Sequence, residues 1–238
     1  MSRFTGQKLY VETPEMFASR DVQSYVQQET ARPCKQWVVD VINGCQESEC
    51  VKLRTIDFLL LPDTERVNRY WRIMSSKRRA VSLNWLAIAT GPGLASLRDL
   101  RGRHVPMLKN LLEQTQRIIF EEAGLAPEEV MAYVHYPPSV YQLHIHFAHP
   151  WVLILFLCFF CGALKSVGRY AQHSHRDIYR IHSLSTVINN LEIDPDYYLK
   201  ASLQISVHRN SPLHFVYDTR APRSYSSVVQ EGARKRLQ

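Results

Sequence analysis

The sequence predicts an α+β fold, with an antiparallel sheet and flanking helices. Several short apolar segments alternate with a period of two, which is typical of strands, along a chain of 238 residues. Other segments place apolar residues at helical spacing, but helices and strands do not alternate strictly, which disfavours a parallel sheet. Charged residues make up 21% of the chain and hydrophobic residues 45%, and this balance excludes a mainly disordered protein.

The N-terminal half contains one predicted helix and two predicted strands. Residues 1–36 are polar and mixed, and we interpret them as a connecting arm. Residues 37–42 form a helix with one apolar face, made of Trp37, Val38, Val41 and Ile42. The apolar run 56–61 predicts a buried strand that ends at Pro62. A second strand is expected over residues 85–90, followed by a glycine-proline-glycine turn.

The C-terminal half contains the strongest helical pattern. It spans residues 106–124, with proline in the first turn, where this residue is tolerated, and glycine at the end. Two strands are predicted at 130–134 and 140–147. A second helix covers 182–191, with apolar residues at i, i+3, i+4 and i+7. The alternating run 203–208 predicts a closing strand.

Charge and cysteine usage limit the possible partners and compartments. There are 29 Lys and Arg residues and 22 Asp and Glu residues, a formal net charge of +7, which suits a nucleotide or RNA partner and also solubility. The basic segment 64–79 is interpreted as a solvated loop. Five cysteines without regular spacing predict reduced thiols, and residues 1–10 have no apolar signal core. We therefore expect a cytoplasmic and nuclear protein.

Residues 151–164 (WVLILFLCFFCGAL) form an apolar run without a charged side chain. A membrane-spanning helix needs about 20 apolar residues, and runs of about 10–14 are more typical of core elements, so we expect no membrane partner. The run contains a C-x-x-C pair, Cys158 and Cys161, but no second cysteine pair lies nearby. We expect neither a zinc site nor a redox site there.

Residues 134–147 (VHYPPSVYQLHIHF) carry the chemistry of the chain. Alternate side chains of a strand share a face, so two sets point in opposite directions. The core set is Leu143, Ile145 and Phe147, and the opposite set is Gln142, His144 and His146. Two imidazoles then stand about 7 Å apart on one face. A bend at two prolines can bring His135 and Ser139 to the same face.

Three interpretations of these residues remain open from spacing alone. A neutral imidazole can attack phosphorus and form a phosphoramidate that water hydrolyses, while the other polar groups donate hydrogen bonds to phosphate oxygens. The H-x-H pair can instead contribute to a zinc site with His149, although no Asp, Glu or Cys ligand stands beside it. Finally, the histidines can be half-buried strand residues without a chemical role.

The segment QLHIHF at residues 142–147 resembles the histidine-triad pattern, in which His alternates with apolar residues. The surrounding sequence resembles one branch of that superfamily, the scavenger mRNA-decapping enzymes, over about residues 36–212. The similar stretches are Gln36–Val38, Phe58–Asp63, Ala87–Ala89, Ser96–Leu100, His104–Leu108 with Asn110, His135–His146, and Val187–Pro195 with Tyr198.

The resemblance implies a histidine-triad fold and hydrolysis of the triphosphate bridge of m7GpppN, the cap fragment left after 3′-to-5′ mRNA decay. The products are m7GMP and a nucleoside diphosphate or shortened RNA, and no metal or other cofactor is required. His144 matches the nucleophile that carries the m7GMP adduct, and His146 the last His of the triad. His135 and Ser139 match additional phosphate contacts. Partners implied are capped RNA fragments, m7GpppN and a second subunit in a homodimer.

The resemblance also implies a cap pocket. Trp37 matches the aromatic residue that stacks on 7-methylguanine, and cation–π stacking on the charged ring contributes about 1–2 kcal/mol when desolvated. Asp63 matches an acidic residue after the Leu-Pro pair of this pocket. Glu47, with Glu49 as a second candidate, has the spacing of the glutamate that binds the guanine edge. On sequence alone, each of these residues also has a structural interpretation. Trp37 fits a core residue of its helix, Asp63 fits a turn residue after Pro62, and Glu47 fits a solvated acid on a loop.

Several positions depart from the family pattern. Gln142 replaces the first His of the triad, and Glu65, followed by Arg66, stands where a Lys is expected. The resemblance also implies that this chain carries little of the N-terminal domain that closes over the cap in the family, and we then expect weak or unselective catalysis. A broader nucleotide or dinucleoside polyphosphate hydrolase and a non-catalytic cap-binding module remain alternatives.

The resemblance predicts three parts of the chain: the arm at 1–36, a catalytic domain at 37–218 and a basic flexible tail at 219–238. Within the catalytic domain, residues 151–162 form an atypical apolar insert without a counterpart in the family. We interpret the insert as translated intron sequence, with a membrane-seeking loop as the alternative.

Overall fold

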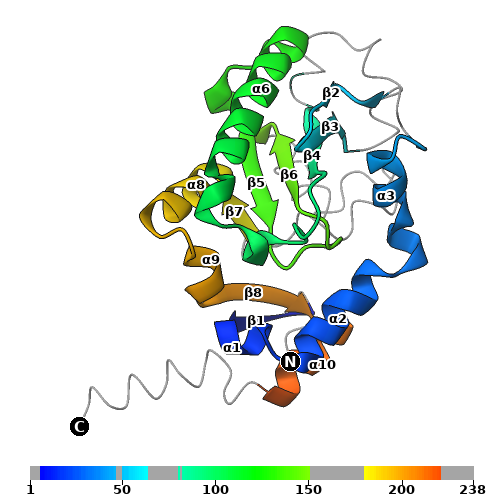
Figure 1. Ribbon diagram of the computed structural model, residues 1–238, viewed down its shortest axis with the longest axis vertical. Coiled ribbons are helices and arrows are strands. Elements are labelled where there is room, and N and C mark those ends of the chain that lie inside the picture. Colours follow the sequence, from blue (N-terminus) through cyan, green and yellow to red (C-terminus); the bar gives the residue numbers. More distant parts are fainter. Residues whose placement is uncertain (1–5, 47–49, 64–79, 81, 151–179, 221–238) are drawn as a thin grey trace, which may run out of the picture.

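The computed structural model describes residues 6–46, 50–63, 80, 82–150 and 180–220 (Figure 1). Its centre is a six-stranded sheet with the order β2-β3-β4-β6-β5-β7, in which all neighbouring strands are antiparallel. The strands are β2 (Leu53–Arg54), β3 (Phe58–Pro62), β4 (Asn84–Ala89), β5 (Met131–His135), β6 (His144–Ala148) and β7 (Ile181–Ser183). With the helices described next, this sheet confirms the predicted α+β class.

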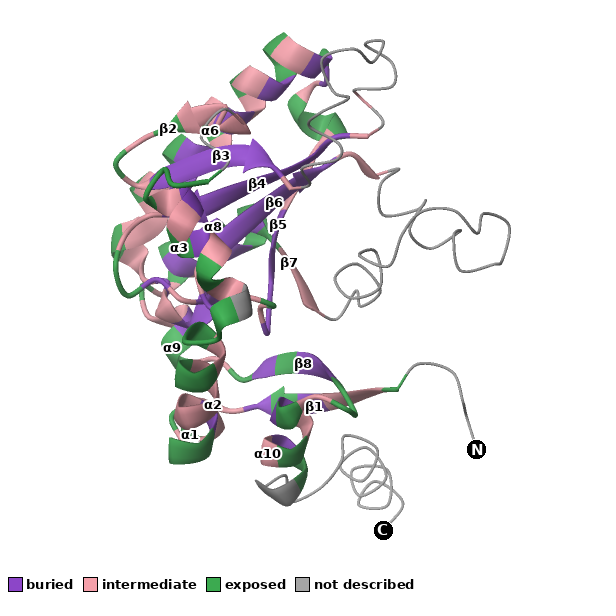
Figure 2. Ribbon diagram, turned by 90° about the vertical axis from the view of Figure 1, so that its right-hand side faces the viewer, coloured by how far each residue is buried: buried purple, intermediate pink, exposed green. Residues whose placement is uncertain are grey.

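One face of the sheet holds the main hydrophobic core. Two amphipathic helices, α6 (Val105–Ala123) and α8 (Leu184–Ile193), pack their leucines and isoleucines against it. Gly124 ends α6 with a backbone φ of 68°, a left-handed conformation that glycine adopts without steric cost. Every residue of β3, β4 and β6 is buried, as Figure 2 shows for the centre of the sheet.

The opposite face of the sheet is covered in part by the short helix α3 (Gln36–Ile42). Val38 and Val41 of this helix are buried against side chains of β3 and β4, namely Leu59, Leu61, Leu86 and Ile88. Because α3 covers only the β3–β4 part of this face, the neighbouring part around β6 is left for polar residues. The sequence predicted this helix and its apolar face.

The N-terminal arm is more regular than its polar sequence predicted. Residues 7–30 form regular elements, namely the strand β1 (Gln7–Glu12) and the helices α1 (Pro14–Phe17) and α2 (Arg20–Thr30). β1 pairs antiparallel with β8 (Leu203–His208) in a separate two-stranded sheet, which lies below the main sheet in Figure 1. The strand predicted at 203–208 is therefore confirmed, but it does not close the main sheet.

Further elements differ from the prediction, and the helix expected at 182–191 begins at Leu184 because Ile181–Ser183 form β7. The strand expected at 140–147 begins at His144, and the Leu143 amide just before it donates to the Leu94 carbonyl at 2.7 Å. Near the C-terminus, α9 (Tyr197–Lys200) precedes β8, and α10 (Pro212–Arg220) follows it. The predicted loop at 64–79, the apolar insert and tail residues 221–238 lie outside the described residues.

Among the described residues, single 3₁₀ turns connect the larger elements. They are η1 (Pro33–Lys35), η3 (Leu97–Asp99), η4 (Gly102–His104) and η5 (Pro127–Glu129). None of the helices in the described ranges combines the length and the apolarity that crossing a membrane requires.

Candidate active site

Strand register places the two triad histidines on the sheet face that α3 covers in part. In the β4–β6 ladder His144 is opposite Ile88 and His146 is opposite Leu86. In the β5–β6 ladder Tyr133 is opposite His146. Residues directly opposite each other in a ladder point to the same face, so both imidazoles and the Tyr133 ring share it. Ile145 and Phe147 point into the main core, as the alternation predicted.

A pocket opens on this face between α3, β6 and the loop that precedes β6. Its lining residues are Trp37, Val38, Asp63, Leu86, Ile88, Ser139, Val140, Gln142, His144 and His146. The pocket therefore brings together six of the eight residues that the sequence singled out. His135 is close behind it, and Glu47 lies outside the described residues.

His144 is buried in the pocket wall and held in one tautomer. Its Nδ1 lies 2.7 Å from the backbone oxygen of Gln142. A carbonyl oxygen only accepts, so Nδ1 carries the proton and Nε2 keeps its lone pair. Burial lowers the pKa of His144 and outweighs the opposing effect of that hydrogen bond; the charges of Arg180 and Lys35 lower it further. The imidazole is therefore neutral near pH 7.

His146 lies between aromatic neighbours that fix its ring. It stacks on Tyr133 with ring centroids 5.1 Å apart, and it meets His144 edge to face at 5.2 Å. The His135 ring is 4.5 Å from that of His146, so three imidazoles lie in a row across β5 and β6. Nδ1 of His146 is 3.9 Å from a carboxylate oxygen of Asp63, which accepts a 2.9 Å hydrogen bond from Asn84.

Gln142, which replaces the first triad histidine, uses its amide locally. Its Nε2 donates to the carbonyl of Ala89 at 2.5 Å, so this donor is directed at the end of β4. The Gln142 side chain forms part of the pocket wall, and its hydrogen bond to Ala89 ties the loop before β6 to the sheet. Gln142 thus supports the geometry of the site.

Three residues near the site were not found from the sequence. Tyr133 supports His146, Lys35 donates to the Ser139 carbonyl at 2.6 Å, and Arg180 donates to the Pro137 carbonyl at 3.0 Å through Nε. A signal for Tyr133 existed, because it alternates with His135 along the same strand. Lys35 and Arg180 are distant in sequence from the loop they hold, so no local pattern indicated them.

Metal binding was one of the open interpretations of the histidines. Within the described ranges, no group of three or more His, Cys, Asp or Glu side chains is placed to hold a metal ion. The zinc interpretation, which needed His149 together with His144 and His146, therefore has no ligand set among those residues.

Comparison with known proteins agrees with the resemblance to scavenger mRNA-decapping enzymes. The sequence profile of a family described as "Scavenger mRNA decapping enzyme C-term binding" matches residues 36–155. The chain is similar to a protein named m7GpppX diphosphatase from Homo sapiens, with 30% identity over 182 residues, covering 75% of this chain and 46% of that protein. A protein of the same name from Ascaris suum is 26% identical over 220 residues, covering 90% of this chain and 63% of the relative.

The chain spans about half the length of the mammalian relatives it matches. Among solved structures, it is similar to the one titled "Crystal structure of aprataxin ortholog Hnt3 in complex with DNA", with a TM-score of 0.43 and 14% identity. That match covers 78% of this chain and 94% of the solved chain.

Proposed function

Because this chain belongs to the family of scavenger mRNA decapping enzymes and carries their C-terminal part, we propose that it hydrolyses m7GpppN cap fragments left by 3′-to-5′ mRNA decay. The observation that carries the proposal is the state of His144. A buried neutral imidazole, with its proton on Nδ1 directed at a carbonyl and its lone pair on Nε2, lines a pocket that also contains Trp37. This is the arrangement that attack on phosphorus requires.

In the first chemical step, Nε2 of His144 attacks the phosphorus of the m7GMP moiety. A P–N bond forms, the bond to the bridging oxygen breaks, and the nucleoside diphosphate or shortened RNA leaves with the electron pair. In the second step a water oxygen attacks the same phosphorus, the P–N bond breaks and its electron pair returns to Nε2. The water gives one proton to solvent, and m7GMP leaves. Throughout, the Gln142 carbonyl holds the proton on Nδ1.

The neighbouring groups bind the phosphates and the base. His146, His135 and Ser139 supply hydrogen-bond donors for phosphate oxygens as charge accumulates on them. Trp37 offers an indole face to 7-methylguanine, whose positive charge favours stacking on an aromatic ring. Asp63 lines the same pocket and accepts hydrogen bonds.

The proposal extends to the assembly and its place in the cell. We propose a homodimer that acts on capped fragments in the cytoplasm and the nucleus. The family resemblance supports both statements.

A second candidate function is a cap-binding module without turnover. The side-chain amide of Gln142 donates a hydrogen bond to the Ala89 carbonyl, so that N–H does not donate to a phosphate in the pocket. A protein with the pocket but a weakened triad would bind m7GMP through Trp37 and release no product.

One experiment separates the two candidates. The purified chain is incubated with m7GpppG, with and without EDTA, in parallel with His144→Asn, and m7GMP is quantified by chromatography. Release that resists EDTA and disappears in the variant supports hydrolysis through His144. Binding of m7GMP by a folded chain that releases no product supports the module. Release that persists in His144→Asn contradicts the proposed nucleophile.

A further inference from the structure

Glu12 is a buried carboxylate that the proposed mechanism does not use. It is the last residue of β1, and its side chain is 1% exposed. Arg98 is equally buried and donates to Oε1 of Glu12 from Nε at 2.9 Å and from Nη2 at 2.7 Å. Two tyrosine hydroxyls complete the shell, with Tyr136 donating to Oε1 at 2.5 Å and Tyr217 donating to Oε2.

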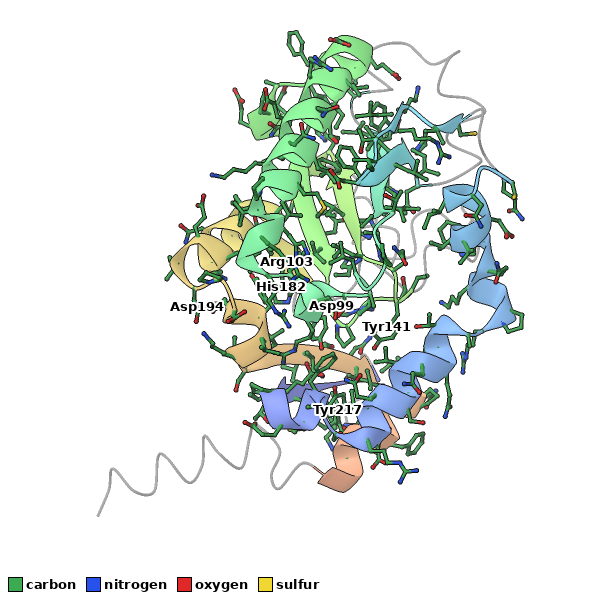
Figure 3. The ribbon with its side chains drawn as sticks, in the orientation of Figure 1. Asp99, Arg103, Tyr141, His182, Asp194 and Tyr217 are labelled. Atoms are coloured by element: carbon green, nitrogen blue, oxygen red, sulfur yellow. The ribbon has the colours of Figure 1, made fainter. Side chains whose placement is uncertain are left out.

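These groups come from parts of the chain that are distant in sequence. Arg98 belongs to η3 and also donates to the carbonyls of Tyr198 and Ala201. Tyr217 comes from α10 and lies beside the two-stranded sheet (Figure 3). Glu12 therefore fixes the β1–β8 unit to the main domain. A buried ion pair of this kind is stable only when its remaining hydrogen-bonding groups are satisfied, as they are here.

Tyr136 connects this cluster to the candidate active site. It directly follows His135, whose ring contacts that of His146, and it begins the loop that leads to Ser139 and Gln142 in the pocket wall. The Tyr136 side chain is buried, and burial together with the nearby Glu12 charge raises the pKa of its hydroxyl well above the usual value. The protonated hydroxyl donates to Glu12.

We propose that Tyr136 is a positioning residue for the reaction: its hydrogen bond to Glu12 sets the start of the loop that carries Ser139 and orients His135 toward His146. This inference rests on the proposed function, because positioning is measured through turnover. It assigns a role in the chemistry to β1, which lies outside the part of the chain that matches the family profile. Displacements of about 1 Å in such supporting residues can reduce rates by as much as about 100-fold.

The chain offers a matched pair of variants for the test. Tyr136→Phe and Tyr217→Phe each remove one hydroxyl from the same carboxylate and preserve a buried ring. Only Tyr136 continues into the site loop. We expect both variants to lower the melting temperature to a similar degree. We expect Tyr136→Phe alone to reduce kcat for m7GpppG, by about 10-fold, whereas Tyr217→Phe retains the kcat of the parent chain.

A second readout does not depend on turnover. The ring-nitrogen resonances of His135 and His146 should shift in Tyr136→Phe and stay unchanged in Tyr217→Phe. If the parent chain releases no m7GMP, the proposed function fails, and the resonances alone decide the positioning role. The positioning role of Tyr136 would be overturned if the two variants changed kcat and the resonances equally, or if neither variant changed them.

Discussion

The imidazole of His146 lies face to face with the phenol ring of Tyr133, with planes 10° apart and centroids separated by 5.1 Å. Strand pairing produces this contact, because the two residues are directly opposite each other in the β5–β6 ladder. The ring of His135 meets Tyr133 edge to face at 5.2 Å. One buried tyrosine therefore contacts two imidazoles of the site.

The first prediction concerns this support. Tyr133→Leu removes the stacking surface, and we expect kcat for m7GpppG to fall by about 10-fold because the His146 ring loses its fixed orientation. Tyr133→Phe keeps the ring and should stay close to the parent kcat. Steady-state kinetics of the two variants measures the difference. A similar loss in both would mean that the hydroxyl, rather than the ring face, is what matters.

The second prediction concerns Trp37 and the methyl group of the cap. Trp37→Ala removes the indole from the pocket, and a desolvated cation–π contact of about 1–2 kcal/mol corresponds to about a 5- to 30-fold weaker Kd for m7GMP. Unmethylated GMP carries no ring charge, so its affinity should change less. Calorimetric titration of both nucleotides into both proteins provides the check. Equal losses for the two nucleotides would point to packing and not to recognition of charge.

The third prediction concerns pH. In the proposed mechanism the neutral form of His144 attacks phosphorus, and burial lowers the pKa of His144 below the ordinary value of about 6.5. The acid limb of kcat/KM should therefore lie at lower pH than that of an ordinary histidine, at the lowered folded-state pKa. Because the pKa of His144 is lower in the folded state than in the unfolded state, its contribution to the free energy of unfolding is fully present above the unfolded-state pKa. This contribution is lost as pH falls through the folded-state pKa. An acid limb above pH 7 would contradict this account.

The fourth prediction uses Lys35 to move that acid limb. The positive charge of Lys35 contributes to the lowered pKa of His144, after burial and Arg180. Lys35→Met removes the charge, so the pKa of His144 should rise and the acid limb should shift to higher pH. Lys109→Met, which breaks an exposed ion pair with Glu192, is the matched control and should leave the limb in place. Titration of the His144 ring nitrogens by NMR reports the shift without an activity assay.

The fifth prediction concerns the position where the triad pattern is broken. Gln142→His restores the family residue, and we expect a several-fold higher kcat. Gln142→Ala leaves the Ala89 carbonyl without its side-chain donor, which should cost about 1 kcal/mol of unfolding free energy and should not raise kcat. Chemical denaturation and initial rates measure the two effects. A Gln142→His variant slower than the parent would show that this site has adapted to the amide.

The spacing of apolar residues was sufficient to predict an element that packs one regular face against a core. Helix α6 was predicted from its apolar spacing and terminal glycine, and β8 from its alternation. Strand β1 was not predicted because the face that includes buried Tyr10 also includes buried Glu12, which breaks the apolar pattern. Its partner, moreover, is about 200 residues away along the chain, beyond any local signal.

The same distinction applies to the site. The shared face of Gln142, His144 and His146 followed from alternation on one strand, and the pocket contains all three. The contacts made by Tyr133, Lys35 and Arg180 depend on tertiary placement, so only the structure revealed them. The roles proposed for Trp37, Ser139 and Asp63 stay predictions.

The pairing of β1 with β8 has a consequence for the order of folding. Gln7 is opposite His208 and Glu12 is opposite Leu203, so this ladder closes a loop that contains the entire six-stranded sheet. Contacts so distant along the chain form slowly, because the entropy of the intervening chain must be lost first. We therefore expect the six-stranded sheet to assemble before this ladder does. Hydrogen exchange would then show the amides of β1 and β8 opening together, at a lower free energy than those of β4 and β6.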